Sequence, residues 1–128
     1  MGGKASRDKG LNYEREIARK LKHIFPDVKR HLEFQYQECD GYDLDNTGKF
    51  KIQCKRLKKY TSISKIEEVQ AKPGEIPALI TKGDRKKDVV CLYLQDFINL
   101  LDRFNKAKEY CELMREKNTA LIIGGTSN

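Results

Sequence analysis

The sequence predicts an α/β or α+β domain in which a central mixed sheet is flanked by helices. Three observations predict this class. Apolar residues recur at helical spacing near both ends of the chain. Apolar and polar residues alternate strictly over residues 49–55, as in a strand with two different faces. Two continuous apolar runs, at residues 76–81 and 89–94, have the length of buried strands.

The first half of the chain predicts one helix followed by three strands. Residues 1–8 show no apolar pattern and are expected to form a flexible basic N-terminus. Residues 9–25 carry apolar side chains at helical spacing, and Pro26 ends this helix. Asn46-Thr47-Gly48 is a turn signal. The expected strands cover residues 28–39, 40–45 and 49–55.

The second half predicts a short helix, a hairpin and a long helix. Ser64 and Glu67 match a capping box that opens a helix through Ala71. The two apolar runs are expected to pair as a hairpin. A long amphipathic helix should cover residues 96–117, and Ala120–Ile123 should form a last short strand. The expected order is thus helix, three strands, helix, two strands and helix, in one domain over residues 9–128.

Charge and composition favour a polyanionic partner. The 128 residues carry a formal net charge of +7, with a sequence pI of about 9.2. No apolar stretch is long enough to span a bilayer and no signal peptide is evident, so we expect a soluble cytoplasmic protein without a membrane partner. No Cys-x-x-Cys pair is present, so a zinc site is not expected. Both His23 and His31 are expected at the surface.

One set of residues has the chemistry that phosphodiester hydrolysis requires. A divalent metal such as Mg²⁺ or Mn²⁺ polarises the phosphate and activates a water, and it prefers oxygen ligands. Candidate ligands are the side chains of Asp43 and Gln53 and the backbone carbonyl of Cys54, with Glu14 as a further carboxylate. Lys55 shares a strand face with Gln53 and would orient the water or stabilise charge on the phosphate.

Three segments resemble the PD-(D/E)xK nuclease superfamily, and within it the archaeal-type Holliday junction resolvases and related phage and bacterial endonucleases. The segments are residues 9–16 (KGLNYERE), 41–44 (GYDL) and 50–56 (FKIQCKR). This resemblance implies a restriction-endonuclease-like core for the domain. It also selects Glu14 over Glu16, and Asp43 over the two neighbouring aspartates, as site residues.

The resemblance further implies a metal-dependent DNA endonuclease with Glu14, Asp43, Gln53 and Lys55 as catalytic residues. It implies DNA, double-stranded or branched, as substrate, a role in DNA recombination, a homodimer, and the cytoplasm of a prokaryotic or phage-infected cell. The sequence departs from the family at Gln53, where an acidic residue is usual. The alternative is therefore a non-catalytic DNA-binding protein on the same fold with a degenerate metal site.

Basic residues around these motifs are the expected DNA contacts. They are Lys9, Arg15, Arg56, Lys58 and Lys59. Ordinary structural roles remain open for every residue of the site. Glu14 is then a charge on a helix surface, Asp43 a turn residue, and Gln53 and Lys55 the wet face of a half-exposed strand.

Overall fold

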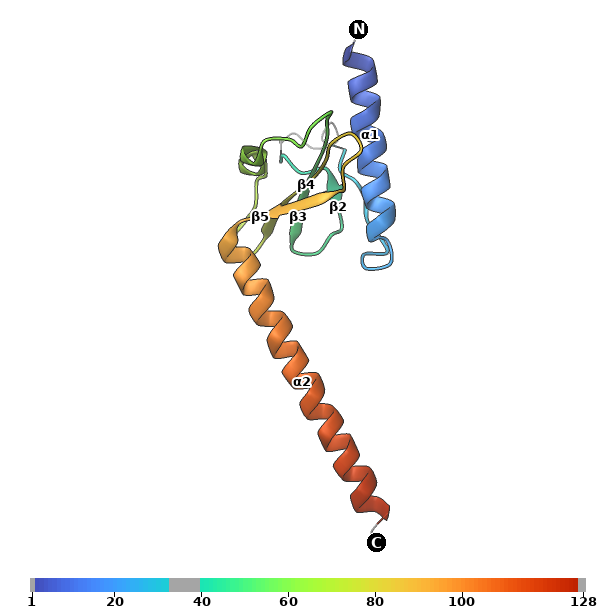
Figure 1. The fold of residues 1–128 in the computed structure, drawn as a ribbon, viewed down its shortest axis with the longest axis vertical. Coiled ribbons are helices and arrows are strands. Elements are labelled where there is room, and N and C mark those ends of the chain that lie inside the picture. The colour runs from blue at the N-terminus through green and yellow to red at the C-terminus, as the bar shows by residue number, and fades with distance from the viewer. Residues whose placement is uncertain (1, 33–39, 127–128) are drawn as a thin grey trace. The chain divides into compact units, whose positions relative to one another are not determined.

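A computed structural model describes residues 2–32 and 40–126 of the chain (Figure 1). The chain divides into two compact units, Met1–Tyr93 and Leu94–Asn128, and each is considered by itself. The elements of the first unit are α1 (Gly2–Leu21), β1 (Lys29–Arg30), β2 (Leu44–Asp45), β3 (Phe50–Arg56), the 3-10 helix η2 (Ile63–Glu68), β4 (Ile76–Lys82) and β5 (Val89–Leu92). The second unit is the single helix α2 (Leu94–Thr126).

The three longer strands form a mixed sheet in the order β3-β4-β5. Strands β3 and β4 are parallel, with Phe50 opposite Ile76 and Arg56 opposite Lys82. Strands β4 and β5 are antiparallel, which confirms the predicted hairpin. The short strands β1 and β2 form a separate antiparallel pair. The chain is therefore mixed α and β with helices beside a mixed sheet, as the sequence predicts.

The main core lies between α1 and one face of the sheet. Its buried members come from α1, both short-strand segments, β3 and β4: Tyr13, Ile17, Val28, Leu44, Ile52, Cys54, Ala78 and Ile80. Each fully buried aliphatic side chain contributes about 1.5–3 kcal/mol. On the other face of β3, Gln53 is also buried, with 3% of its surface exposed. The strand predicted here is confirmed, but burial does not alternate along β3, because the consecutive residues Ile52, Gln53 and Cys54 are all buried.

The predicted turn before β3 is confirmed. Asn46 and Gly48 adopt positive φ angles of 63° and 62°, which asparagine and glycine tolerate best. The Thr47 hydroxyl donates to the carbonyl of Phe50 at 2.6 Å, and the Phe50 amide donates back to the Thr47 carbonyl. The turn thus sets where β3 begins.

Several predicted boundaries need correction. Helix α1 covers Gly2–Leu21 rather than 9–25, so the chain is already helical before Lys9. The short helix is a 3-10 helix whose N-cap is Ser62, with its side chain accepting from the Ser64 amide. The predicted strand at Ala120–Ile123 is wrong, because these residues continue α2. The pattern there, four small or apolar residues, is too short to distinguish strand from helix.

The strand predicted over residues 28–39 is present only at Lys29–Arg30, and residues 33–39 lie outside the described part. The expectation of one domain over residues 9–128 stays a prediction. Across the described ranges, none of the helices is both long and apolar enough to cross a lipid bilayer.

Candidate functional site

Asp43 is held against the middle of β3. Its Oδ2 accepts a hydrogen bond from the backbone N–H of Cys54 at 2.7 Å. Its own amide donates to the carbonyl of Ile52 at 2.7 Å, and its carbonyl accepts from the amide of His31 at 2.8 Å. Hydrogen bonds thus hold both the carboxylate and the backbone of Asp43, so its position relative to β3 is well defined.

His31 braces the segment that carries Asp43, and its expected surface position is wrong. The ring is buried, with 2% of its side chain exposed. Its Nδ1 lies 2.8 Å from Oδ1 of Asp45 and its Nε2 lies 3.1 Å from Oδ2 of Asp40. Each ring nitrogen of His31 therefore has a carboxylate oxygen within hydrogen-bond distance. Two carboxylates on either side of Asp43 are thereby tied to one ring.

Gln53 is oriented by a residue that the sequence did not single out. Its Nε2 donates to Oε2 of Glu68, on η2, at 2.9 Å. Because a carboxylate only accepts hydrogen bonds, the amide nitrogen of Gln53, and not its oxygen, must face Glu68. The opposite atom, Oε1 of Gln53, is buried and has no hydrogen-bond partner among the described residues. A buried oxygen of this kind is costly unless water or a cation meets it.

Glu68 carries negative charge at this end of the site. Hydrogen bonds from Lys65, and then from Gln53, hold the pKa of Glu68 below its ordinary value of 4.5, and Lys55 contributes through its charge. Lys55 therefore lies close enough to Glu68 to influence it. Gln53, Lys55 and Glu68 form one group, on the face of β3 opposite Cys54.

Glu14 belongs to a second group, with Asp43 and Cys54. Its Oε2 accepts from Nε of Arg30 at 3.0 Å. Burial, followed by the charges of Asp43 and Glu14, raises the pKa of the Cys54 thiol. Both carboxylates thus act on the thiol, and Asp43, which is hydrogen-bonded to the backbone of Ile52 and Cys54, lies along the edge of β3. A raised pKa favours the protonated thiol, which is the form that binds metals poorly.

The predicted site residues are therefore brought together in two groups, joined by the hydrogen bond between Asp43 and the backbone of Cys54. In the described ranges, no three or more His, Cys, Asp and Glu side chains are placed to hold a metal ion. The donors that fit Mg²⁺ or Mn²⁺ are oxygens: the Asp43 carboxylate and the partnerless Oε1 of Gln53. Such a site has one fewer charge than a two-carboxylate site.

The expected DNA contacts differ in how firmly they are held. Lys9 and Arg56 both pair with Asp84, at 3.3 and 2.9 Å. Hydrogen bonds from Arg56 and then Lys9 hold the pKa of Asp84 below its ordinary value. Lys58 and Lys59 are exposed in the segment after β3. The first two cations are thus partly neutralised, and the last two are more available to phosphates.

The net positive charge of the chain comes entirely from its first unit. Met1–Tyr93 contains 21 basic and 14 acidic residues, whereas Leu94–Asn128 contains five of each. The whole net charge of +7 therefore belongs to the unit that carries the candidate site. A polyanion would be attracted to this unit rather than to α2.

No protein-family model, curated protein or solved structure matches this chain. The function proposed below therefore rests on the residues and contacts of the chain itself.

Proposed function

We propose that this protein is a metal-dependent DNA endonuclease that uses Mg²⁺ or Mn²⁺. The observation that carries the proposal is the buried amide oxygen of Gln53, which has no hydrogen-bond partner within residues 2–32 and 40–126. The amide nitrogen of Gln53 donates to Glu68, while this oxygen lies on the same strand face as Lys55. A divalent cation held by Asp43 and Gln53 would satisfy that oxygen and polarise a phosphate oxygen.

In this proposal each site residue has a separate role in binding the metal or stabilising the phosphate. Asp43 and Gln53 would hold the metal, with Glu14 contributing a carboxylate directly or through water. Lys55 would place its ammonium at the phosphate, where negative charge develops during hydrolysis. Glu68 would position Gln53 rather than touch the substrate, because its contacts are with Gln53 and Lys65.

The direct test is a cleavage assay on supercoiled, linear and four-way-junction DNA with Mg²⁺ or Mn²⁺. We expect wild-type protein to nick or cut at least one substrate, and Lys55→Ala to lose this activity. Lys108→Ala is the matched control, because Lys108 is an exposed lysine on α2, in the unit without net charge. If wild type cuts none of the substrates with either metal, the enzyme proposal fails. A branched substrate of the Holliday-junction kind would show as preferential cutting of the four-way junction.

The second candidate is a DNA-binding protein without catalysis. The observation that favours it is the amide at position 53, together with the lack of a three-acid group among the described residues. In that protein a water molecule would meet Oε1 of Gln53. DNA binding that is unaffected by Mg²⁺, with no cleavage, would support this candidate.

A homodimer is part of the proposal, because two symmetric cuts need two sites. Helix α2 supports it through its spacing. Apolar residues recur in alternating steps of three and four, as in a coiled coil: Phe97, Leu100, Phe104, Ala107, Cys111 and Met114. Sedimentation equilibrium of wild type and Phe104→Glu tests this. We expect dimer for the first and monomer for the second, and a monomeric wild type would refute it.

A further inference from the structure

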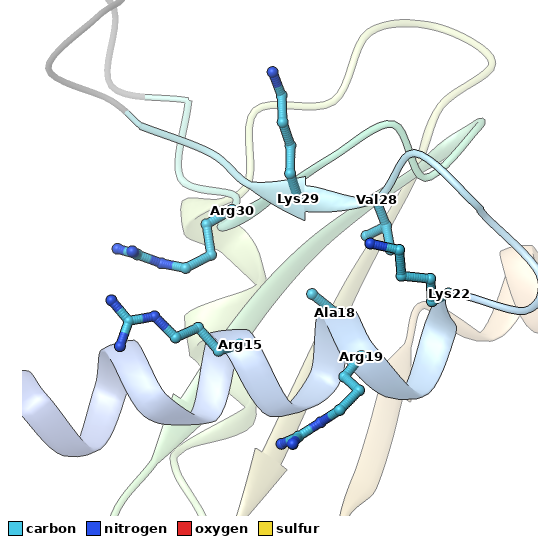
Figure 2. A pocket seen from close by; sticks show the side chains of 7 residues that line it. All are labelled: Arg15, Ala18, Arg19, Lys22, Val28, Lys29 and Arg30. Carbon is cyan, nitrogen blue, oxygen red and sulfur yellow. The ribbon is translucent and has the colours of Figure 1, made fainter.

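A cavity of about 300 Å³ lies between α1 and the segment around β1 (Figure 2). Liquid water occupies about 30 Å³ per molecule, so the cavity has room for a phosphate with several waters. Among the described residues, no acidic side chain lines it, and five of its seven lining residues are basic. The lining residues are Arg15, Ala18, Arg19, Lys22, Val28, Lys29 and Arg30.

Two of these cations lie on the same side of the cavity. The side chains of Arg15, on α1, and Arg30, on β1, extend in the same direction and bring their guanidinium groups to the same side of the cavity, whereas Arg19 and Lys29 point elsewhere (Figure 2). Like charges on one side of a cavity repel each other, and an anion between them turns the repulsion into attraction. A planar guanidinium matches phosphate oxygens with two parallel hydrogen bonds.

The existing contacts leave hydrogen-bond donors of both groups available, although Glu14 partly neutralises the charge of Arg30. Arg30 donates to Oε2 of Glu14 through Nε, at 3.0 Å, so this contact does not use the terminal nitrogens of Arg30. Arg15 makes a long contact of 3.4 Å with the side-chain oxygen of Asn12. None of the acidic residues in the described ranges forms an ion pair with Arg15.

We propose that Arg15 and Arg30 form a clamp for one phosphate of a DNA backbone. DNA is favoured over a small anion because the cavity lies in the unit that carries the entire net charge of +7. The clamp rests on the proposed nuclease function and deepens it. Through the contact between Arg30 and Glu14, the clamped phosphate lies next to the candidate metal ligands. Arg30 thus has two roles, holding Glu14 and gripping the backbone.

The test measures binding in the absence of chemistry. Fluorescence anisotropy of a short labelled duplex in EDTA, over a series of salt concentrations, gives the affinity and its salt dependence. Removing one phosphate-binding cation lowers the slope of log affinity against log salt by about 0.9. Because the two arginines share one phosphate, we expect the Arg15→Gln, Arg30→Gln double variant to lower the slope by about 0.9 in total, and each single variant by no more than that. Lys108→Gln is the control for removing one charge and should leave the slope unchanged.

Two further arms keep the result interpretable. Arg30→Lys keeps the charge but not the planar fork, so its loss of affinity should be intermediate. Titration with inorganic phosphate, followed by the NMR signals of the two arginine Nε groups, tests the other source of phosphate. If phosphate alone shifts both signals at concentrations where the duplex shifts neither, the clamp takes a small anion and the proposal is overturned.

The clamp and the nuclease proposal can fail separately. An unchanged slope for the Arg15→Gln, Arg30→Gln double variant overturns the clamp, even if wild type cuts DNA. Lowered slopes together with no cleavage under any metal support the clamp and refute the nuclease.

Discussion

Replacing Asp43 separates its structural contact from its proposed metal contact. The hydrogen bond from the Cys54 amide to Oδ2 of Asp43, at 2.7 Å, has a charged acceptor and contributes about 1.5–3 kcal/mol. Asp43→Ala leaves that amide without its acceptor, and Cys54 is 6% exposed. For a unit of this size, about 1 kcal/mol corresponds to roughly 4–8 °C in Tm, so a loss of about 2 kcal/mol lowers Tm by about 8–16 °C.

Asp43→Asn keeps an oxygen acceptor but removes the charge. We expect a smaller loss, about 1 kcal/mol and thus roughly 4–8 °C. A metal at one hundred times its Kd stabilises the folded protein by about 2.7 kcal/mol. Mn²⁺ should therefore raise the Tm of wild type by roughly 10–20 °C, and should raise that of Asp43→Asn far less.

The assay is differential scanning calorimetry with and without Mn²⁺. Asp27→Asn is the control, because Asp27 is an exposed aspartate of the same unit. An Mn²⁺-induced rise in Asp43→Asn as large as that in wild type would refute the metal role of Asp43. Equal Tm losses for the alanine and asparagine variants would refute the role assigned to the Cys54 hydrogen bond.

Three further predictions concern neighbouring groups. Gln53→Glu should raise the Mn²⁺ affinity in calorimetric titration, and unchanged affinity would argue against Gln53 as a ligand. Without metal the variant should be less stable, because the new carboxylate faces Glu68, to which the amide of Gln53 donates at 2.9 Å. The hydrogen bond from Tyr13 holds the pKa of Asp88 below its ordinary value of 3.8. The ionised Asp88 therefore stabilises the folded protein at pH values above 3.8, and this stabilisation is lost as the pH falls through the lowered pKa. Tyr13→Phe should therefore lose less stability than wild type between neutral and strongly acidic pH in urea titrations, and an identical loss would count against this contact. Leu44→Ala should cost about 2–5 kcal/mol in the same titrations, since Leu44 is fully buried, and a cost below about 1 kcal/mol would show that the site collapses around it.

Elements with a long, regular pattern could be predicted from the sequence. The strict alternation around Ile52 predicts β3, and the apolar runs predict the hairpin of β4 and β5. Short elements could not be located this way. Strands β1 and β2 have two residues each, too few for a period, and they depend on tertiary pairing with each other.

The candidate site was predictable only in part for the same reason. Asp43, Gln53 and Lys55 lie in patterns that the sequence displays. Glu68 was missed because η2 brings it to Gln53 from 15 positions away. His31 was missed because its partners are 9 and 14 positions further along the chain. No local pattern encodes such contacts.

The parallel pairing of β3 with β4 has a consequence for how the protein folds. Every residue of β3 lies opposite one 26 positions later, whereas the partners in the β4–β5 hairpin are only 8–14 positions apart. Closing the longer loop between β3 and β4 costs more chain entropy, and this cost comes before any strand contact stabilises the pair. The hairpin should therefore form first, and β3 should dock onto it afterwards. Gln53 and the backbone that receives Asp43 both lie on β3. The candidate site should therefore assemble after the hairpin, and during synthesis it can form in this order only after the chain has emerged as far as β5.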